Sequence, residues 1–320
     1  MADLPTVYVL DPYHPDAIAR LTSTPNIRYV LPSDPAKASW HQHATALLVR
    51  SETKIRADDF QRAEKLKVIV KQGVGVDNID LDAARSRGIV VCNTPALNSE
   101  AVAELTISLA LAVARRVCEL DRLIRQGQTV VRSEMLGRSL FRKTVGIVGM
   151  GNIGRVVARK WIGAMEGSIV AYDPFVADGA WSDIPHERVT ELAELLRKAD
   201  VVTLHVPLTE QTRGLIGREH LALMKKEAIL INCARGGIVD EKALLEALQK
   251  RTIFGAALDA MDVEPPTTEA YGEGLLACPN VIMTPHVGAS TVENQSRSGV
   301  AVVETLLAVL EGKDVPNRVV

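Results

Sequence analysis

The sequence predicts an α/β protein made of two Rossmann-like or flavodoxin-like domains, each with a doubly wound parallel sheet. From Thr6 onwards, short β-branched runs alternate with helical segments, which is typical of βαβ units. A second series of the same kind begins with a glycine-rich turn at residues 145–154. A chain of 320 residues is long enough for two such domains.

Composition limits the classes of function. Hydrophobic residues make up 47% and charged residues 24%, as in an ordinary globular protein. A net charge of −2 gives no general attraction for nucleic acid or anionic membranes, so we expect neither as a partner. The four cysteines form no Cys-x-x-Cys, which argues against disulfides and structural zinc and favours a reducing, cytoplasmic setting. The N-terminus shows no signal-peptide pattern, and no apolar run is long enough to span a bilayer.

The residues before the glycine-rich turn form the first domain. Proline and aspartate separate its short apolar runs, for which we expect one helix over 16–21 and strands over 6–10, 46–49, 66–70 and 89–91. A final helix over about 291–310 is expected to return to this domain, so its bounds are residues 1–97 and 291–320. His41 and His43 have no third ligand nearby, and we expect no metal site.

Two turns of this domain are candidates for binding substrate. Arg50 and Ser51 end the second strand, and a turn containing Gly73, Val74 and Gly75 ends the third. The glycines permit a close backbone approach, so the N–H groups there could hold a carboxylate. The alternative is a glycine-rich turn that only leads into the helix beginning at Asp80. The residues alone do not separate these two interpretations.

The segment between the two series is apolar on most sides. We expect one long helix over residues 98–126, because Ala101, Leu105 and Leu109 share a face with later apolar residues. Such a helix needs cover on most sides, so we assign it to the link between the domains and to a dimer contact. It opens the second domain, for which we expect residues 98–290.

The glycine-rich turn carries the signature of dinucleotide binding. A β-branched strand at 145–148 leads into Gly149-x-Gly151-x-x-Gly154 and then a helix, whose N-terminus favours phosphate. The next strand, 169–172, ends in Asp173, which lies 19 residues after Gly154, about where a carboxylate accepts the ribose hydroxyls. That charge would repel a 2′-phosphate and favours NAD over NADP. Alternatively, Asp173 caps the turn before Pro174.

The strands that follow end in polar residues. We expect strands over 201–205, 228–233, 255–260 and 281–283. In an open α/β sheet ligands bind outside the carboxyl ends of the strands. Three residues there suit acid–base chemistry on a carboxylate substrate: Arg235 could bind the carboxylate bidentately, His286 could transfer a proton, and Glu264 could accept the imidazole N–H.

Each of these residues also has a structural interpretation. Arg235 could lie in a surface turn, Glu264 could be solvated before a proline pair, and His286 could be a satisfied strand-end histidine. His205 is a rival histidine, although Pro207 nearby suggests that its turn lines the cofactor. Cys233 has no histidine adjacent in sequence and is a poor nucleophile candidate.

These motifs together resemble a known family. Residues 49–54, 73–78, 93–95, 145–154, 232–240 and 285–290 match, in order, motifs of the D-isomer-specific 2-hydroxyacid dehydrogenases. Within that family the chain is most similar to the phosphoglycerate dehydrogenases. The resemblance implies hydride transfer between NAD and C2 of a 2-hydroxy acid, and a homodimer joined through the nucleotide domains. It also implies a cleft between the two domains that closes on substrate.

The resemblance assigns roles residue by residue. It makes Arg235 the carboxylate anchor, His286 the acid–base and Glu264 its partner. With the two turns of the first domain, the expected substrate-binding residues are Arg50, Ser51, Gly73, Val74, Gly75, Arg235 and His286. The NAD contacts that the glycine motif and the resemblance imply are Val74, Gly149, Gly151, Asn152, Ile153, Gly154, Asp173, Val206, Pro207, Cys233, Ala234, Asp259 and Gly288.

The chain also departs from the phosphoglycerate dehydrogenases. It ends at Val320, so we expect no C-terminal regulatory domain and no serine feedback. Residues 132–138 do not clearly match the basic phosphate-binding element, although Arg50 and Arg132 are candidates. The expected substrate pair is 3-phosphoglycerate and 3-phosphohydroxypyruvate, with glyoxylate or hydroxypyruvate as the alternative.

Two rivals share this fold. NAD-sensing corepressors keep the same three residues, and a substrate screen separates them from enzymes. Formate dehydrogenase relatives carry a glutamine before the loop of the catalytic histidine, where this chain has the Glu264 pattern.

Overall fold

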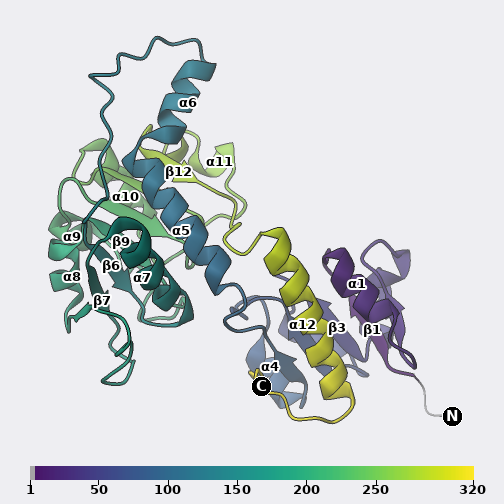
Figure 1. The fold of residues 1–320 in the computed structure, drawn as a ribbon. Coiled ribbons are helices and arrows are strands. Elements are labelled where there is room, and N and C mark those ends of the chain that lie inside the picture. The colour runs from purple at the N-terminus through teal and green to yellow at the C-terminus, as the bar shows by residue number, and fades with distance from the viewer. Residues whose placement is uncertain (1–3) are drawn as a thin grey trace. The chain divides into compact units, whose positions relative to one another are not determined.

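The structure, a computed structural model, describes residues 4–320, and the chain divides into two compact units. The first unit joins the residues up to Asn98 with Ala289–Val320, and the second is Ser99–Gly288 (Figure 1). The expected bounds, 1–97 with 291–320 and 98–290, differ from these by one or two residues. None of the helices formed by the described residues combines the length and apolar character needed to cross a bilayer.

The first unit contains a five-stranded sheet in which every pair of neighbours is parallel. The strand order is β2-β1-β3-β4-β5, so the direction of winding reverses between β1 and β3. The strands are β1 Thr6–Val9, β2 Arg28–Val30, β3 Ala46–Val49, β4 Val68–Lys71 and β5 Val90–Cys92.

Helices cover both faces of this sheet. Val7 and Val9 point to one face, under α1 and α12, while Tyr8 points to the other, under α2 to α4, because side chains alternate along a strand. Thr291 caps α12 by accepting from Asn294 N at 3.2 Å. The helices are α1 Pro15–Thr22, the 3₁₀ helix η1 Pro35–Ser39, α2 Trp40–His43, α3 Ala57–Arg62, α4 Leu81–Ser86 and α12 Val292–Leu310.

The second unit contains a seven-stranded sheet, also parallel throughout. Its order is β12-β11-β10-β9-β6-β7-β8, so the winding reverses between β6 and β9. The strands are β6 Val145–Val148, β7 Ile169–Tyr172, β8 Glu187–Arg188, β9 Val201–Leu204, β10 Ile229–Asn232, β11 Gly255–Leu258 and β12 Val281–Met283.

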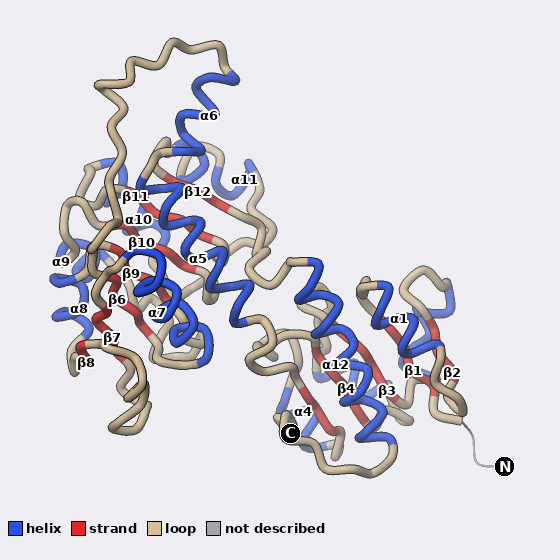
Figure 2. Tube along the Cα trace, in the orientation of Figure 1, coloured by secondary structure: helices blue, strands red, loops and turns tan. Residues whose placement is uncertain are grey.

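This sheet also lies between two layers of helices (Figures 1 and 2). Val145 and Ile147 point toward α5 and α7, whereas Val148 points toward α8, α9 and α10. The helices are α5 Ser99–Ala114, α6 Val117–Arg125, α7 Asn152–Met165, α8 Leu192–Lys198, α9 Arg218–Leu223, α10 Glu241–Gln249, α11 Thr268–Tyr271 and the 3₁₀ helix η2 Leu275–Ala277.

The prediction of one helix over residues 98–126 was wrong. Helix α5 ends at Ala114, and Arg116 takes a left-handed backbone conformation with φ 56° and ψ 30° before α6 begins. The Arg116 guanidinium pairs with Glu119 at 2.8 Å, one turn into α6, and so helps to hold the bend. The residues after α6 form an extended arm, 126–144, that connects α6 to β6 (Figure 2).

The sequence pattern did not predict two short edge strands. The expectation of four strands in the first domain omitted β2, in which two of the three residues are exposed and the third is partly buried. β8 has two residues, Glu187 and Arg188, and no apolar alternation. Edge strands pair on one side only, so they need little of the apolar character that reveals central strands.

Candidate active site

The predicted residues of the second unit gather at one edge of its sheet. The turns after β6, β9, β10, β11 and β12 all leave from the carboxyl ends of adjacent parallel strands. The reversal between β6 and β9 is a topological switch point, where open α/β sheets bind ligands. This edge therefore brings together residues that lie as far apart in sequence as Gly149 and His286.

The glycine-rich turn is compact at two points and open at a third. A Cβ on Gly149 would lie 2.6 Å from the carbonyl oxygen of His205, and Gly149 has φ +101°. A Cβ on Gly154 would collide with the carbonyl oxygen of Gly149, so only glycine lets helix and strand pack this closely. A Cβ on Gly151, in contrast, would meet nothing within 4 Å.

The open space at Gly151 fits a dinucleotide phosphate. Gly151 is the N-cap of α7, which runs for 14 residues from Asn152. The first-turn N–H groups of a helix, including those of Asn152 and Ile153, have no carbonyl partner inside it and present a partial positive charge. A backbone without a side chain at Gly151 leaves room for a pyrophosphate to approach these N–H groups.

Asp173 holds the same turn in place. Its carboxylate accepts from Met150 N at 2.9 Å and from Phe175 N at 3.0 Å. The second bond is the turn cap that was one interpretation of this residue. The first bond ties the end of β7 to the glycine-rich turn, so Asp173 lies beside the expected cofactor position.

His205 is excluded as a proton donor near neutral pH. Burial lowers the pKa of His205 to about 3, so its imidazole is neutral there. Its Nε2 lies 2.9 Å from the hydroxyl of Thr203, and its Nδ1 is buried without a partner among the described residues. The turn continues through Val206 and Pro207, and Val206 Cγ1 would lie 3.0 Å from a Cβ on Gly149.

The turn after β10 presents Arg235. Asn232 Nδ2 donates to the carbonyl oxygens of Arg235 and Ala260, at 2.9 and 3.0 Å, and so joins this turn to the one after β11. One guanidinium nitrogen of Arg235 donates to Ala234 O at 2.7 Å. Cys233 is buried, and burial raises the pKa of its thiol to about 12, so it is a poor nucleophile.

Asp259 shapes the loop that carries the histidine. This carboxylate is 1% exposed and accepts from the Thr284 hydroxyl at 2.7 Å and from Val287 N and Gly288 N, each at 2.8 Å. Three donors satisfy the buried charge, as a buried carboxylate requires. The loop they enclose includes His286, whose backbone is left-handed with φ 55°.

His286 and Glu264 are in direct contact. The imidazole Nδ1 lies 2.8 Å from Glu264 Oε2, and about a third of each side chain is exposed. Glu264 Oε1 accepts from Met261 N at 3.0 Å, which fixes the carboxylate relative to the end of β11. With Nδ1 bonded to a carboxylate, Nε2 is the nitrogen left to face a ligand.

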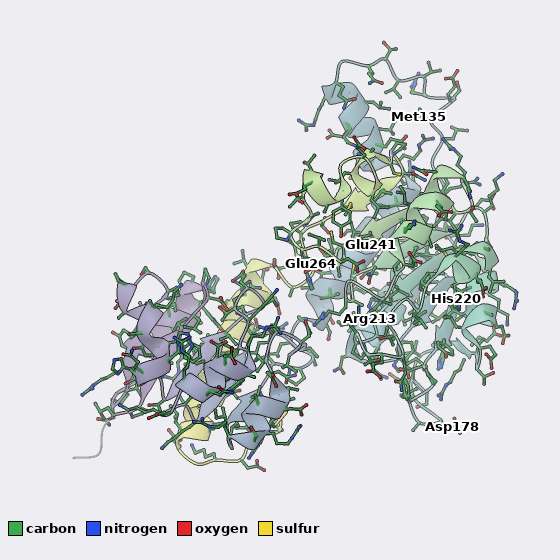
Figure 3. The ribbon with its side chains drawn as sticks, turned by 180° about the vertical axis from the view of Figure 1, so that it is seen from behind. Met135, Asp178, Arg213, His220, Glu241 and Glu264 are labelled. Carbon is green, nitrogen blue, oxygen red and sulfur yellow. The ribbon has the colours of Figure 1, made fainter. Side chains whose placement is uncertain are left out.

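Several charges act on Glu264 (labelled in Figure 3). Burial acts to raise its pKa, but the hydrogen bond and charge of His286, the N–H of Met261 and the charge of Arg235 together lower it below its usual value. Glu264 is therefore a carboxylate at neutral pH, and Arg235 is near enough to affect its ionisation. Arg235, Glu264 and His286 thus belong to one electrostatic cluster.

In the first unit, the predicted substrate residues follow β3 and β4. Arg50 and Ser51 follow β3, while Gly73, with φ +110°, and Val74 and Gly75 follow β4. The N–H groups of Val74 and Gly75 have no acceptor among the described residues. These neighbouring turns lie at the carboxyl edge of their own sheet.

Sequence reasoning missed two residues at that edge, Asp11 and Asn78. Both are buried and bond the turn after β3. Asp11 lies two residues after the last residue of β1. The rule used for the second unit, that polar residues at strand ends are site candidates, would therefore have found it. His41, which was considered for a metal site, lies 2.8 Å from the Asp59 carboxylate. The described residues contain no group of three or more potential ligands arranged for a metal.

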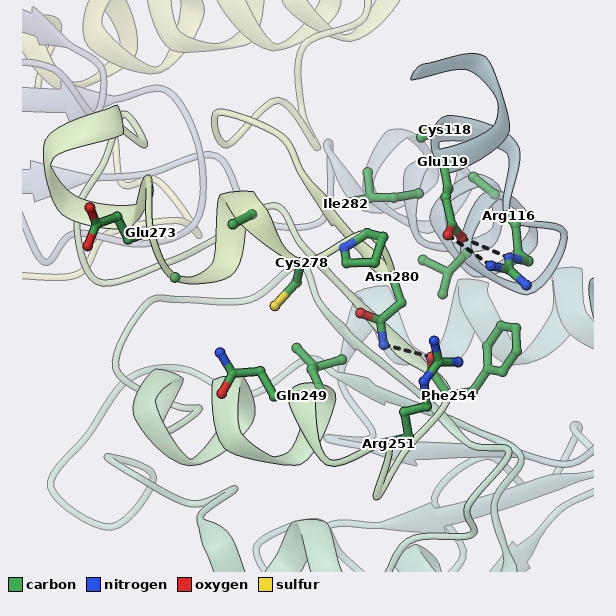
Figure 4. A pocket seen from close by; sticks show the side chains of 16 residues that line it. Arg116, Cys118, Glu119, Gln249, Arg251, Phe254, Glu273, Cys278, Asn280 and Ile282 are labelled. Carbon is green, nitrogen blue, oxygen red and sulfur yellow. Dashed lines mark hydrogen bonds and ion pairs between the residues drawn. The ribbon is translucent and has the colours of Figure 1, made fainter. Parts of the chain in front are cut away.

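A separate pocket of about 250 Å³ lies at the opposite edge of the second sheet (Figure 4). Phe254 and Asn280, which line it, precede β11 and β12, whereas the residues described above follow these strands. The Arg116–Glu119 pair forms one wall. This pocket is therefore not part of the cluster around His286.

Comparison with known proteins agrees with this geometry. The family described as D-isomer specific 2-hydroxyacid dehydrogenase, NAD binding domain, matches residues 107–288. A D-3-phosphoglycerate dehydrogenase from Methanocaldococcus jannaschii is 43% identical over 98% of this chain and 59% of its own length. The chain thus spans about three fifths of that relative.

Two further proteins match over most of both chains. A hydroxypyruvate reductase from Thermotoga maritima is 43% identical over 81% of this chain and 83% of its own. A crystal structure of a protein from Thermus thermophilus superposes with a TM-score of 0.87 at 40% identity, covering 98% of this chain and 100% of the other.

Proposed function

Since this chain belongs to the D-isomer-specific 2-hydroxyacid dehydrogenase family, we propose that it is an NAD-dependent oxidoreductase acting on a small 2-hydroxy or 2-oxo acid. The observation that carries the proposal is the 2.8 Å contact between His286 and Glu264 at the switch-point edge of the nucleotide-binding sheet. Bound at the turn containing Gly151, NAD supplies a hydride acceptor for C2 of the substrate, and NADH a hydride donor.

The proposed role of His286 is proton transfer at Nε2. In the oxidation direction the imidazole takes the proton of the substrate hydroxyl, and in the reduction direction the imidazolium returns it. Glu264, which is ionised at neutral pH, fixes the tautomer through Nδ1 and stabilises the cation. The planar guanidinium of Arg235 matches a carboxylate with two parallel N–H donors and anchors that group of the substrate.

The first unit offers further candidate substrate contacts at the carboxyl edge of its own sheet. The N–H groups of Val74 and Gly75, which meet no acceptor among residues 4–320, suit a carboxylate or carbonyl oxygen, and the Arg50 guanidinium suits a second acidic group. A second acidic group favours 3-phosphohydroxypyruvate, the oxidised partner of 3-phosphoglycerate, as substrate. Hydroxypyruvate and glyoxylate, which carry no phosphate, are the alternatives. The similarity to the Thermotoga hydroxypyruvate reductase supports hydroxypyruvate.

A substrate panel tests the proposal. Purified protein and NADH are mixed with 3-phosphohydroxypyruvate, hydroxypyruvate and glyoxylate in turn, and NADH absorbance is followed. Turnover with at least one 2-oxo acid is expected, fastest with the phosphorylated one. Tight NADH binding without turnover of any member would contradict the enzyme assignment and favour an NAD-sensing binding protein.

The same proposal includes a homodimer formed through the nucleotide-binding units. Helix α6 buries none of its residues, and exposed apolar side chains lie along it and the arm: Val117, Ile124, Val131, Leu136 and Phe141. Large apolar side chains exposed along one segment favour burial against a partner. The four cysteines are free thiols, which supports the cytoplasmic setting included in this proposal.

Light scattering on the wild-type protein and on Ile124→Glu tests the dimer. Twice the chain mass is expected for the wild type, and half that value for the variant, because a buried charge opposes association. A wild-type monomer, or a variant that stays dimeric, would contradict this interface.

A further inference from the structure

The winding of the first sheet also reverses, between β1 and β3. In sheets with this strand order the ligand crevice lies outside the carboxyl ends of the two strands that flank the reversal. Asp11 follows β1 after one residue, and Arg50 follows β3 directly. Arg50 thus occupies the expected ligand position of its own unit, and Asp11 is its neighbour across the reversal.

Asp11 bonds the turn that begins at Arg50. The carboxylate is 4% exposed and accepts from Arg50 N and from the Thr53 hydroxyl, each at 2.5 Å. The guanidinium of Arg50 donates to the carbonyl oxygen of Pro12 at 2.9 Å. The dipeptide Asp11-Pro12 therefore holds Arg50 at both its backbone and its charged end.

Asn78 holds the same turn from the other side. Its amide donates to the carbonyl oxygens of Arg50 and Thr53, at 2.7 and 2.6 Å. Asn78 ends the turn that contains Val74 and Gly75, and its own carbonyl oxygen accepts from Ile55 N at 2.9 Å. Asn78 thereby joins the turn that begins at Arg50 to the turn that contains Val74 and Gly75. Asp11 is the charged group that accepts hydrogen bonds from the first of these turns.

Tyr13 lies near Asp11 and bonds the end of β3, so the hydrogen-bond acceptors and donors around Asp11 are fixed. The nearby Tyr13 hydroxyl donates to Val49 O at 2.9 Å, and burial, followed by the charge of Asp11, raises the pKa of Tyr13 well above its usual value. The phenol is therefore a neutral donor that holds the end of β3. A buried carboxylate with two short hydrogen bonds is strongly oriented, since a misplaced charge would lack compensation.

We propose that Asp11 is a positioning residue for substrate binding, which sets the Arg50 side chain at the switch point of the first unit. The inference rests on the proposed function, because it requires that Arg50 contact an acidic group of the substrate. Asp11 itself has its carboxylate oxygens engaged within the chain and touches no substrate.

Substitution of Asp11 separates positioning from stability. Asp11→Ala should raise KM for 3-phosphohydroxypyruvate about tenfold while kcat and the NADH dissociation constant stay within about threefold. Asp11→Asn keeps the shape, can accept from Arg50 N and can donate to the Thr53 hydroxyl, so its KM should stay within about threefold of wild type. A lower Tm in Asp11→Ala with an unchanged KM would overturn the proposal.

A matched pair guards against misfolding of Asp11→Ala. Thr53→Val removes one of the two bonds to the carboxylate, whereas Thr53→Ser keeps it. KM should rise about threefold in the valine variant and hold in the serine variant. Equal KM values in the two variants would overturn the proposal even if Asp11→Ala did not fold.

A double-mutant cycle tests whether Asp11 acts through Arg50. KM for the Asp11→Ala/Arg50→Ala protein should equal that for Arg50→Ala alone, because the position of a missing guanidinium cannot matter. Independent, multiplying effects would overturn the proposal. A wild-type protein without turnover would overturn the proposed function and this inference with it, whereas an active wild type with unchanged KM in Asp11→Ala would overturn this inference alone.

Discussion

Replacing Glu264 with glutamine keeps the shape of the side chain and removes its charge. Glutamine can still accept from His286 Nδ1, but it no longer stabilises the imidazolium that forms as His286 takes the substrate proton. A hydrogen bond to a charged group contributes about 1.5–3 kcal/mol. Because about a third of each side chain is exposed, water screens the pair and the lower figure applies. A loss of about 1.4 kcal/mol corresponds to a tenfold fall in kcat.

Steady-state oxidation of the 2-hydroxy acid with NAD measures this change. Glu269→Gln is the matched control, since Glu269 is an exposed carboxylate five residues along the chain, on α11. We expect kcat for Glu264→Gln to fall about tenfold, with unchanged NADH binding, and kcat for Glu269→Gln to equal wild type. Equal kcat values for wild type and Glu264→Gln would refute the assigned role of the carboxylate.

Three further predictions concern the cofactor turn, the rival histidine and the acid pair. Gly151→Val should weaken NADH binding by at least about tenfold, because its side chain would fill the open space above α7; an unchanged dissociation constant would contradict the cofactor position. Burial lowers the pKa of His205 to about 3, whereas the unfolded chain accepts a proton near 6.5, so folding stability should be complete above pH 6.5 and fall below it by up to about 1.4 kcal/mol per pH unit. The free energy of unfolding of His205→Gln, measured with urea, should not show this fall below pH 6.5. Identical pH dependence of that free energy in wild type and His205→Gln would refute the prediction. In His286→Ala the pKa of Glu264 should rise because its hydrogen bond and neighbouring charge are gone, and an unchanged NMR titration of that carboxyl would count against the pair.

Strands in the middle of each sheet could be predicted from sequence because they are buried on both faces. Residues 145–148 and 201–204, for example, are mostly β-branched or apolar, and every position in both runs is buried. The polar residues that follow such strands must share one edge of a parallel sheet, so Arg235 and His286 could be placed together without coordinates. For Glu264 the residues alone left two interpretations, a partner of His286 or a solvated residue before the proline pair, and the family resemblance implied the first.

The break at Arg116 could not be read from the pattern. Apolar residues continue at helical spacing through Val113, Val117 and Leu120, and no glycine or proline marks the bend. A left-handed arginine is unfavourable in isolation, so tertiary contacts and the Arg116–Glu119 pair must supply what local propensity does not.

Positioning residues were also hidden, for a different reason. Asp259 was expected only as a cofactor contact, yet its oxygens hold the loop of His286, and Asp11 was not singled out at all. A strand-end aspartate has the same sequence signature whether it faces a ligand or the backbone of the next turn. Hydrogen-bond partners, which only coordinates supply, separate these two roles.

Turnover by His286→Ala tests the central claim most directly. The variant is assayed with NADH and the best 2-oxo acid of the panel, while NADH binding is followed separately by fluorescence. Loss of general acid catalysis should lower kcat by about 10²–10⁴-fold and leave the NADH dissociation constant unchanged. Undiminished turnover in a variant that still binds NADH would contradict the assignment of His286 as the proton donor and acceptor.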